Sequence, residues 1–190
     1  MDDMLIATRP DREEHFACVR ECLQILQEND LFIKPEKCTF FTTKIELLGF
    51  IIDKGKIEME QAKLKGIIEW PTPTTLKQLR SFLGFCNFYH RFIKDYANHS
   101  KALNKLLKKT EMWNWTDEQQ KAFDDLKNSF STQPVLLIPN QDKPFFIMAD
   151  ASQYATGTVL EQEDTNSDQH PCAYLSQMMT SAEKTYQVYD

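Results

Sequence analysis

Long hydrophobic runs are missing from this 190-residue sequence. No stretch approaches 18 consecutive apolar residues, and no basic segment followed by an apolar one opens the chain. A membrane-spanning helix needs about 20 apolar residues, and a secretory leader has that basic-then-apolar order. We therefore expect a protein that neither spans a membrane nor is secreted.

Cysteine is sparse and unpatterned. The five cysteines form no C-x-x-C pair and no cluster with histidine, and internal repeats and low-complexity segments are also missing. An odd number of unpatterned cysteines argues against a disulfide framework or a zinc site, and it indicates a reducing compartment. We interpret all five as packing residues: Cys18, Cys22, Cys38, Cys86 and Cys172.

The formal net charge of -6 is unevenly distributed. Residues 71–110 carry eight lysines and arginines against one aspartate, whereas residues 111–190 carry thirteen carboxylates against four lysines. Basic segments bind phosphate backbones, and clustered carboxylates repel them unless a metal ion lies between. This pattern is typical of a metal-dependent nucleic-acid enzyme, although acidic solvated faces would give the same count.

Residues 71–93, PTPTTLKQLRSFLGFCNFYHRFI, predict a helix with two faces. Thr74 or Thr75 can cap it, and the core face has three- and four-residue steps at Leu76, Leu79, Leu83 and Cys86. The opposite, basic face carries Lys77, Arg80, Gly84, Asn87, Arg91 and Lys94. A mid-helix glycine costs roughly 1 kcal/mol relative to alanine, so Gly84 indicates that something bulky, such as a nucleic-acid strand, packs there. The alternative is a solvated helix in which Gly84 lets another helix approach.

The motif FLGFCNFYHRFI after a WPTP turn resembles the thumb helix of reverse transcriptases from gypsy-type LTR retrotransposons. The resemblance implies that Arg80, Gly84 and Phe88, one turn apart, follow the minor groove of an RNA/DNA primer-template. It implies further nucleic-acid contacts at Lys77, Asn87 and Arg91.

The opening residues, MDDMLIAT, resemble the end of the YxDD box of the reverse-transcriptase palm. The resemblance implies that Asp2 and Asp3 are catalytic residues that bind Mg²⁺, with a tyrosine expected before Met1. Taken alone, two aspartates near a terminus carry little information.

Residues 45–59, IELLGFIIDKGKIEM, predict a β-hairpin. Two β-prone runs flank Asp53-Lys54-Gly55, where glycine supplies the positive φ of a tight turn. Gly49, inside the first run, predicts a bulge or the close approach of another backbone. The resemblance implies a primer grip in which Leu48, Gly49 and Phe50 hold the primer's 3′ end; the alternative is an ordinary hairpin with a packing glycine.

Further helices are predicted over residues 11–28, 60–69, 101–109 and from 117 onward, with Thr116 as a cap. Short strands are predicted around Pro35, in the segment LFIKPEKCTFF.

Three strands are predicted near the end of the chain, over residues 144–149, 156–162 and 172–176. The segments FIMADAS and AYLSQMMTSAEKTYQVYD resemble the opening of a gypsy-type RNase H. The resemblance implies that Asp150 is a catalytic Mg²⁺ ligand for cleavage of the RNA strand of a hybrid, whereas a lone strand-end aspartate is otherwise a turn residue. Glu183 is interpreted as a helix cap, since the family's catalytic glutamate would lie just beyond Asp190.

These patterns predict an α+β fold. The resemblance implies that it comprises the end of a right-hand polymerase palm (residues 1–70), a helical thumb (71–132) and the first half of an RNase H-like α/β domain (133–190). The resemblance implies RNA-directed DNA polymerase and RNase H activities that need Mg²⁺, deoxynucleoside triphosphates (dNTPs) and an RNA/DNA hybrid. It leaves a dimer open and implies cytoplasmic virus-like particles, then the nucleus.

We expect this chain alone to be inactive, because both active sites are incomplete. The competing hypothesis is a non-catalytic nucleic-acid-binding relic or a co-opted thumb module. A third is a partly folded polypeptide, because half an RNase H sheet exposes an unpaired strand edge.

Overall fold

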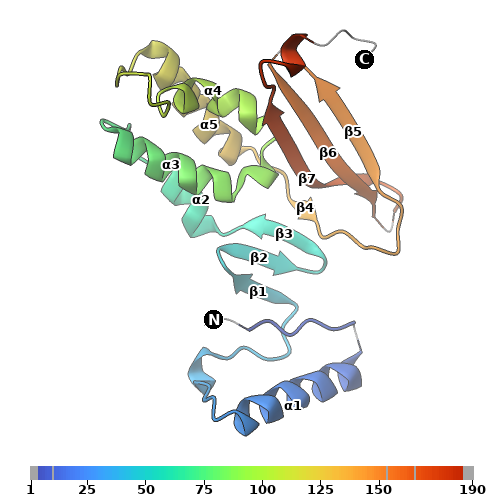
Figure 1. Cartoon of the computed structure of the whole chain (residues 1–190). Coiled ribbons are helices and arrows are strands. Elements are labelled where there is room, and N and C mark those ends of the chain that lie inside the picture. The colour runs from blue at the N-terminus through green and yellow to red at the C-terminus, as the bar shows by residue number, and fades with distance from the viewer. Residues whose placement is uncertain (1–3, 10, 153, 165, 186–190) are drawn as a thin grey trace. The chain divides into compact units, whose positions relative to one another are not determined.

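The computed structural model describes residues 4–9, 11–152, 154–164 and 166–185, which belong to two compact units (Figure 1). The first unit comprises residues 1–43 and the second residues 44–190. The domain borders predicted at residues 70 and 132 fall inside the second unit and stay predictions. Asp2 and Asp3 lie outside the described residues.

A 17-residue helix, α1 (Arg12–Glu28), makes up much of the first unit and confirms the helix predicted there. The Asp11 carboxylate caps it by accepting hydrogen bonds from the backbone N–H groups of Glu13 and Glu14, at 2.8 and 3.2 Å. Such a cap satisfies donors that the first turn leaves unpaired.

The segment after α1 corrects one expectation. A single turn of 3-10 helix, η1 (Pro35–Lys37), stands where strands were predicted, and the described residues 31–43 contain no strand. A strand needs an extended backbone and a partner, but Phe41 has φ +54° and packs its ring against Phe16, with 4.5 Å between centroids. The aromatic contact is made in place of a β-ladder.

Two tight turns build the first sheet of the second unit, in which β1 (Lys44–Leu47), β2 (Phe50–Asp53) and β3 (Lys56–Met59) are antiparallel. The Lys54-Gly55 turn joins β2 to β3 with φ values of 47° and 77°, which confirms the predicted hairpin. The Leu48-Gly49 turn joins β1 to β2 in the same way, with φ values of 51° and 83°. Gly49 is therefore not a bulge, as one alternative had it, but the second residue of a two-residue turn.

Four helices supply most of the core: α2 (Gln61–Ile68), α3 (Leu76–Phe88), α4 (Tyr96–Lys105) and α5 (Asp117–Ser131). Two begin at predicted caps, because Gln78 N donates to Thr75 Oγ1 at 3.3 Å and Thr116 N donates to Gln119 Oε1 at 3.2 Å. The helix predicted over residues 101–109 instead begins five residues earlier and ends at Lys105. The fully buried side chains of the helices are Ile67, Leu79, Phe82, Cys86, Leu103, Phe123, Leu126 and Phe130.

A two-residue strand, β4 (Leu136–Leu137), returns the chain to the first sheet after α5. It pairs antiparallel with β3, so the strand order is β1-β2-β3-β4. Ile138 N also donates to Gly55 O at 2.7 Å, and Leu136 is fully buried. The helices α2–α5 are thus inserted in the sequence between β3 and β4, which are neighbouring strands of one sheet.

The second sheet consists of β5 (Phe146–Ala151), β6 (Ala155–Glu163) and β7 (Gln169–Met178), antiparallel in the order β5-β6-β7. It confirms the three predicted strands: β6 and β7 are longer than expected, and β5 has the expected length but begins two residues later. Helix α4 packs against β7 (Figure 1), where Ala97 N donates to Ser176 Oγ at 2.8 Å.

A short 3-10 turn, η3 (Glu183–Thr185), follows the sheet. Thr180 N donates to the Glu183 carboxylate at 2.6 Å, which confirms Glu183 as a cap. The described helices and strands together form the expected α+β fold, and no described helix is long and apolar enough to cross a membrane.

Candidate nucleic-acid interface

One face of α3 is exposed to solvent and carries Lys77, Arg80, Gly84 and Asn87 at helical spacing. A Cβ built on Gly84 would meet no atom within 4 Å, so no helix of the described chain packs there. Within the described part of the chain, neither Lys77 nor Arg80 pairs with a carboxylate. The face therefore offers two unneutralised cations beside open backbone, the arrangement that a phosphodiester strand requires.

This exposed face ends at Asn87, which corrects the predicted stripe. His90 Nδ1 donates to Asn87 O, and the chain continues as a 3-10 turn, η2 (His90–Phe92), instead of further helix. Arg91 is consequently half-buried where η2 packs against β7. Burial raises the pKa of the Cys172 thiol, and the Arg91 guanidinium partly offsets that rise. Arg91 is not on the α3 face, and its contact with nucleic acid stays a prediction.

The Leu48-Gly49 turn is held by the residue that ends α3. Tyr89, only 2 % exposed, donates its hydroxyl to Gly49 O at 3.4 Å. Burial, with a smaller effect of the Glu60 carboxylate, raises the pKa of Tyr89, so the hydroxyl keeps the proton that it donates. A Cβ on Gly49 would overlap the Tyr89 oxygen, so this position needs glycine for space as well as for its positive φ.

Stacked aromatic rings join the same turn to the exposed face of α3. Phe50 stacks on Phe88 with 5.3 Å between centroids and an interplanar angle of 23°. Phe88 is 53 % exposed, and Leu48 at the tip of the turn is 66 % exposed. The structure thereby brings together two predicted groups of site residues, the primer grip and the thumb helix, although their role stays a prediction.

Asp150 is the penultimate residue of β5 and lies opposite Gly157, so it stands at the end of the strand as predicted. Its carboxylate is exposed and accepts a hydrogen bond from Ala151 N at 2.9 Å. The described residues contain no group of three or more His, Cys, Asp or Glu side chains that could hold a metal ion. Asp150 alone does not make a two-metal site, and the described residues therefore do not fit one by themselves.

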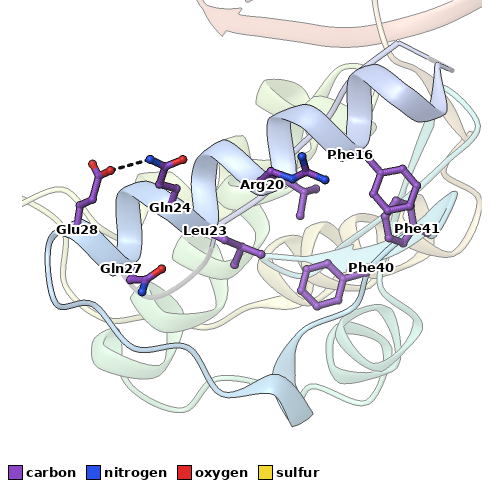
Figure 2. Close-up of a pocket in the computed structure, with 9 residues that line it drawn as sticks. Phe16, Arg20, Leu23, Gln24, Gln27, Glu28, Phe40 and Phe41 are labelled. Carbon is purple, nitrogen blue, oxygen red and sulfur yellow. Dashed lines mark hydrogen bonds between the residues drawn. The ribbon is translucent and has the colours of Figure 1, made fainter.

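An open groove of about 760 Å³ lies on the first unit, between α1 and residues 40–41 (Figure 2). Phe16, Leu23, Phe40 and Phe41 supply its apolar wall. On its polar rim, Gln24 Nε2 donates to the Glu28 carboxylate at 2.9 Å (Figure 2). Apart from Arg20 and Glu28, the groove is lined by apolar side chains and neutral amides, and we assign it no chemistry.

Over all 190 residues, the chain is 33 % identical to the Tf2-3 transposon polyprotein of Schizosaccharomyces pombe and 32 % identical to the Tf2-7 polyprotein of the same yeast. Residues 1–52 match the family described as reverse transcriptase (RNA-dependent DNA polymerase). Residues 115–190 match the family described as the RNase H-like domain found in reverse transcriptase. The chain therefore contains parts of two reverse-transcriptase domains and is similar over its whole length to retrotransposon polyproteins. It spans 14 % of the length of these two relatives.

Solved structures show the same fold as this chain. The foamy viral protease-reverse transcriptase dRH in complex with double-stranded DNA matches with a TM-score of 0.79 and 22 % identity, over 95 % of this chain and 32 % of that one. The foamy viral protease-reverse transcriptase in complex with an RNA/DNA hybrid matches with a TM-score of 0.78 and 21 % identity, over 95 % and 24 %. These matches confirm the predicted fold class.

Tyr89 is the residue of this chain that the sequence analysis missed. It lies 40 positions from Gly49, and no local pattern connects the two. The available signal was Gly49 itself, which predicted the close approach of another backbone, whereas the Tyr89 side chain is what approaches it.

Proposed function

We propose that this chain is part of a gypsy-type retrotransposon enzyme that copies RNA into DNA and cleaves the RNA strand of the hybrid, and that it binds the RNA/DNA primer-template along α3. One observation carries the proposal: beside the open backbone of Gly84, on an exposed helix face, Lys77 and Arg80 have no carboxylate partner among the described residues. Support comes from the similarity to the Tf2 polyproteins and to foamy viral reverse-transcriptase structures in complex with double-stranded DNA and with an RNA/DNA hybrid.

Each residue of the interface has a proposed task. Lys77 and Arg80 bind phosphates, and Gly84 lets the strand approach the helix. Leu48, Gly49 and Phe50 hold the primer's 3′ end, because their turn is tied to α3 through Tyr89 and Phe88. A duplex bound on α3 would therefore have its primer end positioned by the Leu48-Gly49 turn, which is attached to the same helix.

Mg²⁺ is the ion that we propose for both activities, with Asp2, Asp3 and Asp150 among its ligands and dNTPs as substrates. Because the described residues do not form a metal site by themselves, no catalytic step is assigned to them. We expect no Mg²⁺-dependent primer extension from the 190-residue polypeptide. The proposed setting is a cytoplasmic virus-like particle and then the nucleus, with a dimer as one assembly to test.

The binding proposal is tested by the salt dependence of affinity for a labelled RNA/DNA hybrid, measured by fluorescence anisotropy. In the variant Lys77→Ala/Arg80→Ala, the slope of log K against log salt should fall by about 2, because two phosphate contacts are lost. Lys121→Ala, an exposed lysine on α5, is the control and should leave the slope unchanged. An unchanged slope in the double variant would reject α3 as the interface.

Gly84→Leu tests the same face without changing its charge. The added side chain occupies open space and improves helix propensity, so the fold should persist while affinity for the hybrid falls. Wild-type affinity in this variant would show that no strand approaches Gly84.

A non-catalytic binding module is the second candidate. The observation that favours it is the lone Asp150, which has no partner ligands among the described residues. Hybrid binding without primer extension, by a longer polyprotein segment that includes Asp2 and Asp3 with their flanking sequence, would support the module over the enzyme.

A further inference from the structure

A second group of cations lies away from the α3 face. Lys101, on the exposed side of α4, places its Nζ 3.4 Å from the centroid of the Tyr154 ring, in the turn between β5 and β6. Lys184, in η3, places its Nζ 5.9 Å from the same centroid. Two ammonium groups from separate segments therefore converge on one aromatic ring.

The Tyr154 ring stands on a fixed backbone. Tyr154 N donates to Ser152 Oγ at 3.3 Å, and Met179 N donates to Tyr154 O at 2.8 Å. The turn is thus bonded on both sides, while the ring itself is 44 % exposed. A ring held in this way orients an ammonium group through cation–π attraction before any ligand arrives.

The two ammonium groups keep their charge available. Within the described residues, neither Lys101 nor Lys184 forms an ion pair with a carboxylate. Glu183, the sequence neighbour of Lys184, directs its carboxylate to Thr180 N at 2.6 Å. Four more lysines flank Lys101 between residues 94 and 109 of this segment, against the single carboxylate of Asp95.

We propose that Lys101, Tyr154 and Lys184 form a phosphate-binding site for a nucleic-acid strand, distinct from the α3 face. The proposal rests on the proposed function, because the ligand is the backbone of the same RNA/DNA duplex. The ring lowers the entropic cost of binding by ordering a long lysine side chain in advance. Two cations at one exposed point then match the charge of a phosphodiester.

The test measures affinity for a labelled RNA/DNA hybrid over a potassium chloride series. Lys101→Ala and Lys184→Ala should each lower the salt slope by about 1, and Lys101→Arg should restore it because arginine keeps both the charge and the ring contact. Lys121→Ala on α5 removes the same charge at a site without a ring contact and should leave the slope unchanged. Thermal unfolding of each variant checks that the fold is intact.

The ring is tested by a conservative pair of variants. Tyr154→Leu should weaken binding several-fold, with little change in the salt slope because every cation remains. Tyr154→Phe should bind nearly as wild type, since it keeps the ring that orients Lys101. A Tyr154→Leu variant with wild-type affinity would remove the ring from the site and overturn the proposal.

The remaining outcomes separate this site from the proposed function. If Lys77→Ala/Arg80→Ala weakens binding while Lys101→Ala and Lys184→Ala bind as wild type, the new site is overturned and the α3 interface stands. If none of these variants changes the slope, both proposals fail. If Lys101→Ala lowers only the melting temperature, the ring contact is an internal brace between α4 and the sheet, which also overturns the proposal.

Discussion

Replacing Gly49 with alanine tests the contact between the Leu48-Gly49 turn and Tyr89. Gly49 has φ +83°, and a Cβ there would overlap the Tyr89 hydroxyl oxygen. Gly55 is a matched control, because it occupies the same second position of a two-residue turn at φ +77° with no atom within 4 Å of its Cβ. The two alanine variants share the backbone strain and differ only in the neighbour.

The expected magnitudes follow from that difference. A left-handed backbone costs an L-residue about 1 to 2 kcal/mol, which both variants incur. At Gly49 the displaced Tyr89 hydroxyl loses its hydrogen bond while it stays buried, which adds about 1 to 3 kcal/mol. For a unit of about 150 residues, each kcal/mol lowers the melting temperature by about 2 to 4 °C. We therefore expect a fall of about 10 °C for Gly49→Ala and about 4 °C for Gly55→Ala.

The assay is thermal unfolding followed by circular dichroism. Urea unfolding of the same variants supplies the free energies, and Tyr89→Phe completes a double-mutant cycle. Phenylalanine removes the oxygen that the new Cβ would meet, so the cost of Gly49→Ala in that background should approach the cost of Gly55→Ala. The coupling free energy between positions 49 and 89 should then be about 1 kcal/mol or more. Equal costs for the two alanine variants, or no coupling in the cycle, would refute the contact.

Three other predictions concern thiols, pH and aggregation. Burial raises the pKa values of the Cys86 and Cys172 thiols, so a thiol-reactive dye at about pH 8 should label them last, after Cys18, Cys22 and Cys38; one common rate would contradict this packing. Backbone hydrogen bonds, that of Asn166 N foremost, lower the Asp164 carboxyl pKa below its ordinary value of 3.8; the loop stabilisation is therefore complete above that value and lost as pH falls through the lowered pKa. Hydrogen exchange of the Asn166 amide, corrected for intrinsic exchange, should show less protection as the pH falls through the lowered pKa, and constant protection would exclude the effect. Ile147, 68 % exposed on the edge strand β5, should promote association of the chain with itself. Ile147→Lys should therefore reduce light scattering at an unchanged melting temperature, and equal scattering would show that this strand edge does not drive association.

Local chemistry made several elements predictable. Gly55 specifies its turn, because few other residues adopt positive φ at the second position. Thr75 begins α3 because its hydroxyl accepts a hydrogen bond from Gln78 N, and Thr116 begins α5 because its N–H donates to the Gln119 side chain. The α3 face at Lys77 and Arg80 followed from helical spacing alone.

Other features depend on partners that lie far away in the sequence. Leu48 adopts φ +51°, a conformation that nothing in its side chain favours, because the turn is fixed by β1–β2 pairing and by Tyr89. Helix α3 ends at Phe88 without glycine or proline. The His90 ring donates to Asn87 O, the chain continues as η2, and Arg91 is therefore not part of the predicted stripe. Ring packing at Phe41 likewise replaced a predicted strand.

The pairing of β3 with β4 sets an order of folding. These two strands close a loop that runs from about residue 58 to residue 135, so bringing them together in an unfolded chain costs about 4 kcal/mol in loop-closure entropy. The two residue pairs between β3 and β4 cannot offset that entropic cost before other structure has formed. The helices α2–α5, by contrast, are joined by contacts between residues that lie closer in the sequence. We expect β4 to dock after the helical core has formed, so that Leu136 reports the last step of assembly. A polypeptide that ends before residue 134 would keep the helices but lose the strand that completes the sheet beside Ile57.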